Sequence, residues 1–400
     1  IDGPLTSVHA ARDSFGVRPM FFSKLDNGFT FCSELKGLAG LYSNAQQFPC
    51  GMAMTYQTDT SDISWHRHYN IEYPRLNVAE IIILQGIRDT LMRAVKKRLH
   101  ADRLIGALLS GGLDSSLIAA LIVKILREEG STIPLETFCI GMKGGTDFKY
   151  ARMVADKIGS NHTEVIKTQE DFLNAIPEVI ETIESYDITT VRASVGQYLI
   201  SQYVKENTDI KVLFIGDGSD EVTNGYIYSQ RAPTAEDLYQ DAIRLTQEIM
   251  YFDGLRADRC IADNEIEARL PFLDTEFVDY YLRINPKLKQ YTPERMGKYL
   301  LRKAFADMDL LPEEVLWRRK EAFSDGVSAT GDKSEERETH QSWHQVIQNH
   351  VDTIISDEEF DTQSKKYTHL PPKTKEAYYY RKIFGEKFGE EYANVIPKYW

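Results

Sequence analysis

The chain has 400 residues, of which 42% are hydrophobic and 27% charged, and its formal net charge is -13. Length and composition are those of a globular protein of two or three domains with ample core. The negative charge argues against a broad nucleic-acid or anionic membrane surface, because such surfaces need clustered positive charge. The longest apolar stretch, 104–126, contains Asp114 and Lys124, so it is no candidate for a membrane span.

The four cysteines show neither the paired spacing of a metal site nor the pattern of a disulfide framework. They are Cys32, Cys50, Cys139 and Cys260. Free thiols are typical of a reducing compartment, so we expect a cytoplasmic protein. The chain begins at Ile1 instead of Met, and we expect a fragment or a processed product.

Residues 1–70 hold short β-type runs separated by turn residues. Asp26-Asn27-Gly28 lies between the apolar runs 20–22 and 29–32 and predicts a β-hairpin. We interpret this region as a small sheet fragment.

A helical pattern over 77–99 leads into alternating strand and helix patterns. Strands are predicted at 104–109, 137–141, 163–166 and 211–215, and helices begin at Asp147, Gln169 and Val191. This alternation predicts a parallel sheet with helices on both faces. Beyond about residue 230 the pattern is helical, with loops at 286–295 and 321–340, and we expect the polar stretch 326–340 to be mobile.

The most informative stretch runs from Leu104 to Ala120, an apolar strand, a Ser-Gly-rich turn and the first turns of a helix. Gly111 and Gly112 allow the backbone to turn sharply and to approach a ligand. The hydroxyls of Ser115 and Ser116 and the free N–H groups of the helix face one point, which makes an anion site. Asp114 would repel a phosphate unless a divalent cation lies between them, so the turn predicts a pyrophosphate site that needs Mg²⁺.

A second apolar strand, 212–215, ends in Gly216-Asp217-Gly218-Ser219-Asp220-Glu221. Ligands of parallel sheets bind beyond the carboxyl ends of the strands, so both turns are expected on the same edge. So many acids at one edge favour a metal or a cationic substrate.

The chain resembles the synthetase domain of glutamine-hydrolysing asparagine synthetases over about residues 50–390. The motifs that carry the resemblance are SGGLDSS (110–116), IESYDITTVRAS (183–194), GDGSDEV (216–222), EARLPFLD (267–274), GKYLLR (297–302), WRRKEAFSDGVS (317–328) and TKEAYYYRKIF (374–384). The first loop alone would indicate only the wider ATP-pyrophosphatase superfamily.

The resemblance implies an ATP-dependent carbon–nitrogen ligase of asparagine biosynthesis. The side-chain carboxylate of aspartate attacks the α-phosphate of ATP to give β-aspartyl-AMP and pyrophosphate, and ammonia then displaces AMP. It also implies an α/β fold like that of the adenine nucleotide alpha-hydrolases, a parallel sheet followed by a helical C-terminal part. A partial β-rich fragment of an N-terminal-nucleophile domain would precede this sheet.

The resemblance assigns roles to single residues. Lys298 matches a family lysine whose ammonium stabilises charge on the α-phosphate, and it would act with Asp217 and Asp114. Thr189 and Arg192 match positions of aspartate recognition. Asp114 and Asp220 would hold Mg²⁺. The expected ATP-binding residues are Leu109, Ser110, Gly111, Gly112, Asp114, Ser115, Ser116, Ile140, Ile215 and Gly216.

Three departures from the family pattern matter. Asp217 stands where the family usually has Glu, which shortens the reach of a base toward the incoming amine. Ile215 replaces a serine near adenosine. No residue matches the N-terminal cysteine that hydrolyses glutamine. We therefore expect residues 1–70 to be a remnant of the glutaminase (class II amidotransferase) domain, residues 75–390 to be the synthetase domain, and ammonia to be the nitrogen donor.

Two alternatives remain open. One is a truncated, catalytically weak remnant that acts as a binding partner, which the missing glutaminase part and Asp217 favour. The other is a carboxylate-adenylating relative similar to β-lactam synthetase, against which the segment 189–192 and EARLPFLD count. A separate glutaminase or a second copy in a homodimer are the expected protein partners.

Overall fold

The computed structural model describes residues 6–26, 28–71, 74–320 and 341–400. Its centre is a five-stranded sheet of order β11-β10-β7-β8-β9 in which all neighbouring strands are parallel. The strands are β7 (Ile105–Leu108), β8 (Glu136–Gly141), β9 (Asn161–Ile166), β10 (Val212–Phe214) and β11 (Glu267–Arg269). The middle strands are buried on both faces, as expected for a parallel sheet between helices. The predicted parallel sheet is confirmed.

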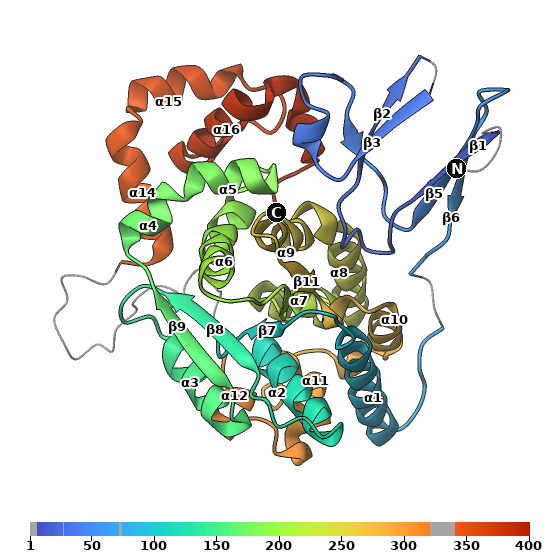
Figure 1. Cartoon of the computed structure of the whole chain (residues 1–400), viewed down its shortest axis with the longest axis vertical. Coiled ribbons are helices and arrows are strands. Elements are labelled where there is room, and N and C mark those ends of the chain that lie inside the picture. The colour runs from blue at the N-terminus through green and yellow to red at the C-terminus, as the bar shows by residue number, and fades with distance from the viewer. Residues whose placement is uncertain (1–5, 27, 72–73, 321–340) are drawn as a thin grey trace.

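Two groups of helices cover the two faces of this sheet (Figure 1). One group comprises α1 (Glu80–Arg98), α2 (Leu113–Glu128) and α3 (Asp147–Ile158). The other comprises α6 (Ile188–Asn207), which contacts β8, and α9 (Asp253–Ala262), which contacts β11. The helix α5 (Ile176–Ile183) packs on α6 and α9, and the short α4 (Gln169–Asn174) lies beside α5 and α6. Ten of the 16 residues of α2 are buried, so this helix lies deep in the core.

The part of the chain after residue 230 is mainly helical, as predicted, with one correction. The short α7 (Ser219–Thr223) precedes this part. Besides α9, its helices are α8 (Ala235–Glu248), α10 (Thr275–Arg283), α11 (Tyr299–Phe305), α12 (Glu313–Leu316), α14 (Trp343–Ile354), α15 (Asp357–Gln363) and α16 (Lys375–Phe388). The purely helical prediction was wrong at β11, a strand that pairs with β10 from Val212↔Glu267 to Phe214↔Arg269. Three residues show no periodicity of their own, so only the pairing with β10 reveals the strand.

Short 3₁₀ turns complete the chain. They are η1 (Leu35–Gly37), η2 (Ile227–Arg231), η3 (Ile249–Tyr251), η4 (Pro271–Leu273), η5 (Pro286–Leu288), η6 (Ala306–Met308), η7 (Ser364–Lys366) and η8 (Glu390–Val395). The predicted loop at 286–295 thus contains one such turn, whereas the predicted loop at 321–340 and its mobile part lie outside the described residues.

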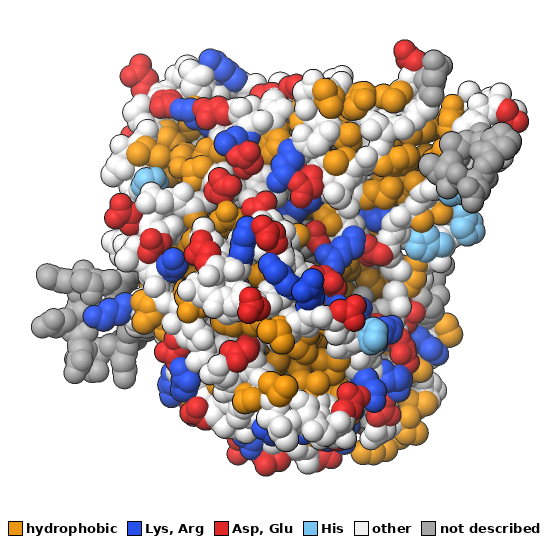
Figure 2. All heavy atoms as spheres, in the orientation of Figure 1, with side chains coloured by type: hydrophobic (Ala, Val, Ile, Leu, Met, Phe, Trp, Pro, Cys, Tyr) orange, Lys and Arg blue, Asp and Glu red, His pale blue; other side chains and the backbone are white. Residues whose placement is uncertain are grey.

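The N-terminal region forms two small antiparallel sheets. One has the order β1-β5-β6, from β1 (Ser7–Ala11), β5 (Met52–Gln57) and β6 (Ile63–Arg67). The other has the order β3-β2-β4, from β2 (Phe21–Leu25), β3 (Gly28–Cys32) and β4 (Gln46–Gln47). The predicted hairpin is confirmed in its strands, since Leu25 pairs with Gly28, while Asn27 lies outside the described residues. Apolar side chains gather over these sheets (Figure 2).

Buried polar contacts join the N-terminal region to the central sheet domain. The carboxylate of Glu184 accepts the backbone N–H groups of Leu35 and Lys36, both at 2.8 Å. Arg259 of α9 pairs with Glu34 at 2.6 Å and with Glu184 at 3.5 Å. Glu184 and Arg259 are 2% and 3% exposed, so these charges are held inside the contact.

All four cysteines are free, as the sequence predicts. Among the described residues, no helix is both long and apolar enough to cross a membrane.

Candidate active site

A cleft of about 1080 Å³ opens at the carboxyl ends of β7, β8 and β10. Its walls come from the turn after β7, the turn after β10, the N-terminal half of α6, and the segments 225–230, 291–298 and 318–320. The two turns that the sequence predicts on one edge therefore lie in one cavity.

The turn after β7 is shaped by its glycines and serines. Gly111 has φ 74, and a side chain there would overlap Ala151 and Tyr150 of α3. The hydroxyl of Ser115 accepts the N–H of Ser110 at 3.2 Å and lies 3.0 Å from the hydroxyl of Ser110. The turn thus places two hydroxyls beside the N-terminus of α2, where anions are stabilised.

Not every predicted phosphate-binding residue reaches the cleft. Ser110, Gly112, Asp114 and Ser115 line it, whereas Gly111 and Ser116 do not. Ser116 is fully buried. Gly111 acts through its backbone shape, and its carbonyl accepts a hydrogen bond from Arg318 at 3.1 Å.

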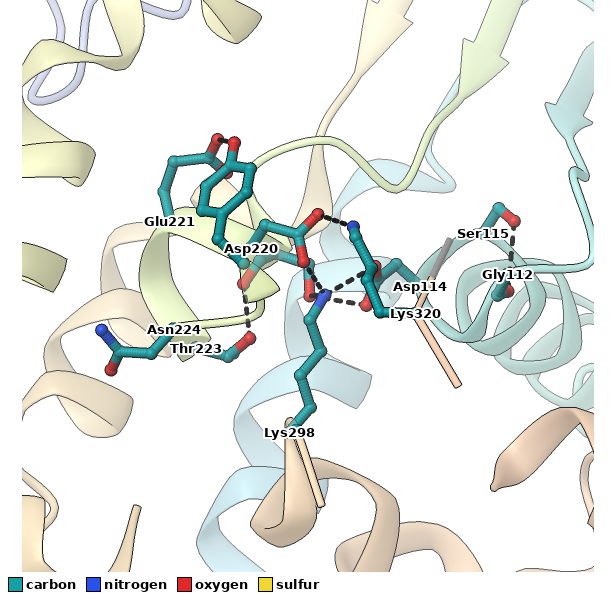
Figure 3. Close-up of polar contacts among 12 residues, drawn as sticks. Gly112, Asp114, Ser115, Asp220, Glu221, Thr223, Asn224, Lys298 and Lys320 are labelled. Carbon is teal, nitrogen blue, oxygen red and sulfur yellow. Dashed lines mark hydrogen bonds and ion pairs between the residues drawn. The ribbon is translucent and has the colours of Figure 1, made fainter. Parts of the chain in front are cut away.

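The ammonium group of Lys298 lies between two carboxylates, as Figure 3 shows. Its Nζ is 2.6 Å from Asp114 Oδ2 and 2.6 Å from Asp220 Oδ1. Ser219 donates to Asp114 Oδ1 at 2.7 Å and accepts from Lys298 at 3.1 Å. The structure therefore brings together three predicted residues from α2, α7 and the start of α11.

The backbone of Lys298 is strained. This residue has φ 60 and ψ 28, in the left-handed region that non-glycine residues rarely adopt. Its side chain is only 3% exposed, so it is not a solvated helix lysine. Gly225 leaves the space that the lysine occupies, because a Cβ there would overlap Lys298 and Asp220.

Two further cations, Arg318 and Lys320, also line the cleft. The sequence analysis predicted no role for them. Lys320 pairs with Asp220, and Arg318 donates to Asp147 at 3.0 Å and lies over the ring of Tyr150. Burial would raise the pKa of Asp220, but Lys298 and Lys320 outweigh it and hold that pKa below its ordinary value. Both residues lie in the motif 317–328, which is the sequence feature that could have identified them.

Asp217 also lines the cleft, among polar groups. Its Oδ1 pairs with Arg256 of α9, and its Oδ2 accepts a hydrogen bond from Gln197 of α6 at 3.5 Å. Arg256 also donates to Gln197 at 3.1 Å and pairs with Asp253 at 3.1 Å. Burial raises the pKa of Asp217, although Arg256 opposes this rise. Arg256 and Gln197 were not predicted from the sequence.

Two acids, Glu221 and Asp253, share the hydroxyl of Tyr226. Tyr226 donates to Glu221 and, at 2.8 Å, to Asp253. Burial and the neighbouring Asp253 raise the pKa of Glu221 well above its ordinary value.

The remaining predicted residues also line the cleft. Leu109, Ile140, Ile215 and Gly216 form an apolar wall at the strand ends. A Cβ at Gly216 would lie 2.8 Å from the N atom of Ser115, so this glycine allows the two turns to pack closely.

Thr189 and Arg192 lie on the α6 wall of the cleft. Arg192 is already paired, because its Nε donates to Glu376 of α16 at 2.6 Å and its Nη2 contacts the same carboxylate. A carboxylate substrate would therefore meet an arginine whose orientation is fixed by Glu376.

The donor set of the cleft suits Mg²⁺ bound together with a phosphate. Carboxylate oxygens are preferred Mg²⁺ ligands, and one or two carboxylates with substrate phosphates are a common set. Asp114 and Asp220 both contact one cation, Lys298, and so already share a positive charge. The described residues contain no group of three or more His, Cys, Asp or Glu that could hold a metal by itself.

The family model and the curated relatives that match this chain belong to one family. The family model "Asparagine synthase" matches residues 86–246 and 229–396. The glutamine-hydrolysing asparagine synthetases of Gallus gallus and Homo sapiens are each 41% identical to this chain, over 424 and 425 residues. Each alignment covers 100% of this chain and 73% of the relative.

A solved structure, the NMN synthetase from Francisella tularensis, matches with 13% identity and a TM-score of 0.25, over 54% of this chain and 98% of that chain. This score is too low to establish a shared fold, so the fold rests on the sheet topology of the chain itself.

Proposed function

The chain belongs to the asparagine synthetase family of carbon–nitrogen ligases, and from this premise we propose how its cleft joins ammonia to the side-chain carboxylate of aspartate at the expense of ATP. The observation that carries the proposal is the buried ammonium of Lys298 between Asp114 and Asp220, at the N-terminus of α2.

In the first step the aspartate carboxylate attacks the α-phosphate of ATP, and pyrophosphate leaves. Ser110, Ser115 and the N-terminus of α2 hold the β- and γ-phosphates, while the apolar wall of Leu109, Ile140 and Ile215 contacts adenosine. Lys298, fixed by its strained backbone, stabilises the charge that builds on the phosphate. Lys320 and Arg318 add positive charge on the pyrophosphate side.

Mg²⁺ is expected to be held by Asp114 and Asp220 with the phosphates, where it would neutralise their charge. Lys298 and Lys320 hold the pKa of Asp220 below its ordinary value and so keep this carboxylate ionised.

In the second step ammonia attacks the activated carboxyl carbon and AMP leaves. Asp217 takes the proton that the nitrogen loses, while Arg256 and Gln197 fix the direction of its carboxylate. Thr189 and Arg192 face the aspartate substrate across the cleft.

The wider assignments belong to the same proposal. We assign residues 1–70 to the glutaminase domain and residues 75–390 to the synthetase domain. Ammonia reaches the cleft from solution, from a separate glutaminase or within a homodimer, and the protein works in the cytoplasm. Burial raises the pKa of the Cys50 thiol, which does not favour this residue as a nucleophile.

The test is pyrophosphate release by the purified chain with ATP, Mg²⁺ and a panel of amino acids. We expect release with aspartate only, and asparagine once ammonium is added. Lys298→Ala should lower the rate roughly 10²–10³-fold, whereas Lys303→Ala, an exposed lysine of the same helix paired with Glu80, should leave it unchanged. Release with no amino acid, or equal rates in both variants, would contradict the proposal.

A further inference from the structure

The segment that ends at Trp400 is fixed at three successive residues. Lys398 pairs with Glu248 at 2.6 Å, and the hydroxyl of Tyr399 donates to the carbonyl of Leu370 at 3.0 Å. The backbone N–H of Trp400 donates to Asp187 Oδ2 at 2.9 Å. The segment 398–400 is thus held in one place.

Asp187 ties Trp400 to the helix that lines the cleft. Its other oxygen accepts the N–H and the hydroxyl of Thr190, both at 2.8 Å, and so caps the N-terminus of α6. Asp187 is 1% exposed, so this cap is buried. The position of Trp400 is therefore coupled to the α6 wall that carries Thr189 and Arg192.

The indole of Trp400 packs on two tyrosines of the opposite wall. Its ring lies 4.9 Å from Tyr226 and 6.1 Å from Tyr228 in edge-to-face geometry, and the two tyrosine rings stack at 5.7 Å. All three side chains line the cleft. Trp400 thus links the N-cap of α6, through its backbone N–H, to Tyr226 and Tyr228, through its indole. Tyr226 in turn donates to Asp253, which pairs with Arg256.

We propose that Trp400, with Tyr226 and Tyr228, is an aromatic wall that keeps water from the activated aspartate. The inference rests on the proposed function. A buried tyrosine–carboxylate cluster lies directly behind this wall, since Tyr226 donates to Glu221 and Asp253. The wall excludes solvent from the cleft and also fixes Tyr226, so Trp400 is a positioning residue.

The reaction that the wall suppresses is hydrolysis of the adenylate. The oxygen of water bonds to the side-chain carbonyl carbon of β-aspartyl-AMP, the bond from that carbon to the phosphate oxygen breaks, and AMP leaves with the electron pair. Aspartate is regenerated with one oxygen from water, and the proton goes to solvent. Each such event consumes ATP and yields no asparagine.

The experiment compares asparagine formed with pyrophosphate released, with ammonium present, in the wild type and in Trp400→Ala. A second measurement follows ¹⁸O from labelled water into aspartate. Trp400→Phe retains a ring at the wall, and Trp65→Ala removes an indole of similar exposure, 42% against 38%, from the distant strand β6.

We expect the wild type, Trp400→Phe and Trp65→Ala to form equimolar asparagine and pyrophosphate. Trp400→Ala should release pyrophosphate at nearly the wild-type rate, form severalfold less asparagine per pyrophosphate, and incorporate ¹⁸O into aspartate. If Trp400→Ala stays equimolar, or loses both products in parallel, the wall has no such role.

If Trp400→Ala does not fold, Tyr228→Ala, which opens the wall from its other side, is judged by the same criteria. A wild type that releases no aspartate-dependent pyrophosphate contradicts the proposed function instead.

Discussion

Lys298 combines a left-handed backbone, burial and two carboxylate neighbours, and each of these features costs free energy unless the surroundings compensate it. The two acids compensate the charge of the ammonium. In return the cation stands at a fixed point of the cleft before any substrate binds, which is what stabilisation of a transition state requires.

Asp217 gives the clearest separation of the two chemical steps. Asp217→Asn removes a proton acceptor but leaves Arg256 its partner Asp253. We expect the rate of asparagine formation to fall by roughly 10²-fold or more, while the single-turnover burst of pyrophosphate keeps nearly the wild-type rate, whereas Asp217→Glu keeps the carboxylate and retains activity. Both products are followed within one turnover, and an equal loss of both rates in Asp217→Asn would assign Asp217 to the first step.

Lys289 provides a test of stability against pH. Burial, with Arg75 nearby, lowers its pKa from 10.5 to about 7. Its ammonium donates to the carbonyl of Tyr281 at 3.3 Å and lies near the rings of Tyr239 and Tyr281. Between pH 7 and 10.5 the unfolded chain binds more protons at this lysine than the folded chain, so its contribution to the free energy of unfolding increases with pH.

Lys289→Met should therefore be more stable than the wild type at pH 7, and the difference should shrink toward pH 10. Denaturant unfolding of both proteins at several pH values measures this difference. A gap that stays constant or widens with pH would show that the folded protein does not disfavour the charged lysine.

Local patterns predicted those site residues that lie in short motifs. Asp114 and Asp220 lie at the starts of the helices that follow the buried strands β7 and β10, and Lys298 lies in a motif with family resemblance. Arg256 and Gln197 could not be predicted in this way, because they come from the middle of two helices. An arginine on such a helix is usually solvated, and only the packing of α6 against α9 turns both side chains toward Asp217.

At the scale of the element, α7 and the turn after it show how closely the backbone approaches the site. Gly225 follows α7, and its N–H donates to the carbonyl of Asp220 at 2.9 Å. A methyl group at Gly225 would overlap Lys298 and Asp220, whose side-chain ends can move aside.

Gly225→Ala is therefore expected to fold normally while the activity falls by roughly 10²-fold, because the ammonium is displaced from its place. Pyrophosphate release and the midpoint of thermal unfolding are the two measurements. Full activity in a folded Gly225→Ala protein would mean that the position of the ammonium is not critical.

Elements with a long periodic pattern were predictable, and elements defined by pairing were not. α1 and α2 each repeat apolar residues over several turns, so their patterns are clear. β11 has three residues and β4 has two, and both exist because a neighbouring strand offers backbone partners.

At the scale of the whole molecule, α9 connects two parts. Arg256 of this helix faces the cleft, whereas Asp258 and Arg259 face the N-terminal region, where they pair with Arg18 and with Glu34. Order in the N-terminal region is thus coupled to the helix that orients Asp217. β1 pairs with β5, which lies about 45 residues further along the sequence. No local sequence pattern predicts this pairing.

Glu184 tests this attachment. Glu184→Ala would leave Arg259 without one buried partner and two N–H groups without acceptors, so we expect a loss of about 3–5 kcal/mol in the free energy of unfolding. Glu181→Ala, on the exposed side of the same segment, removes a surface pair with Lys387 and should cost about 0–1 kcal/mol. Denaturant titration compares the two, and equal losses would show that the buried contact does not stabilise the chain.

The most direct test of the account is the fate of ¹⁸O in the side-chain carboxylate of aspartate. If that carboxylate attacks the α-phosphate, and ammonia then breaks the bond between carbon and oxygen, one labelled oxygen must appear in the phosphate of AMP. We predict labelled AMP and unlabelled pyrophosphate from the wild type with ATP, Mg²⁺ and ammonium. Unlabelled AMP alongside newly formed asparagine would contradict the adenylation mechanism assigned to this cleft.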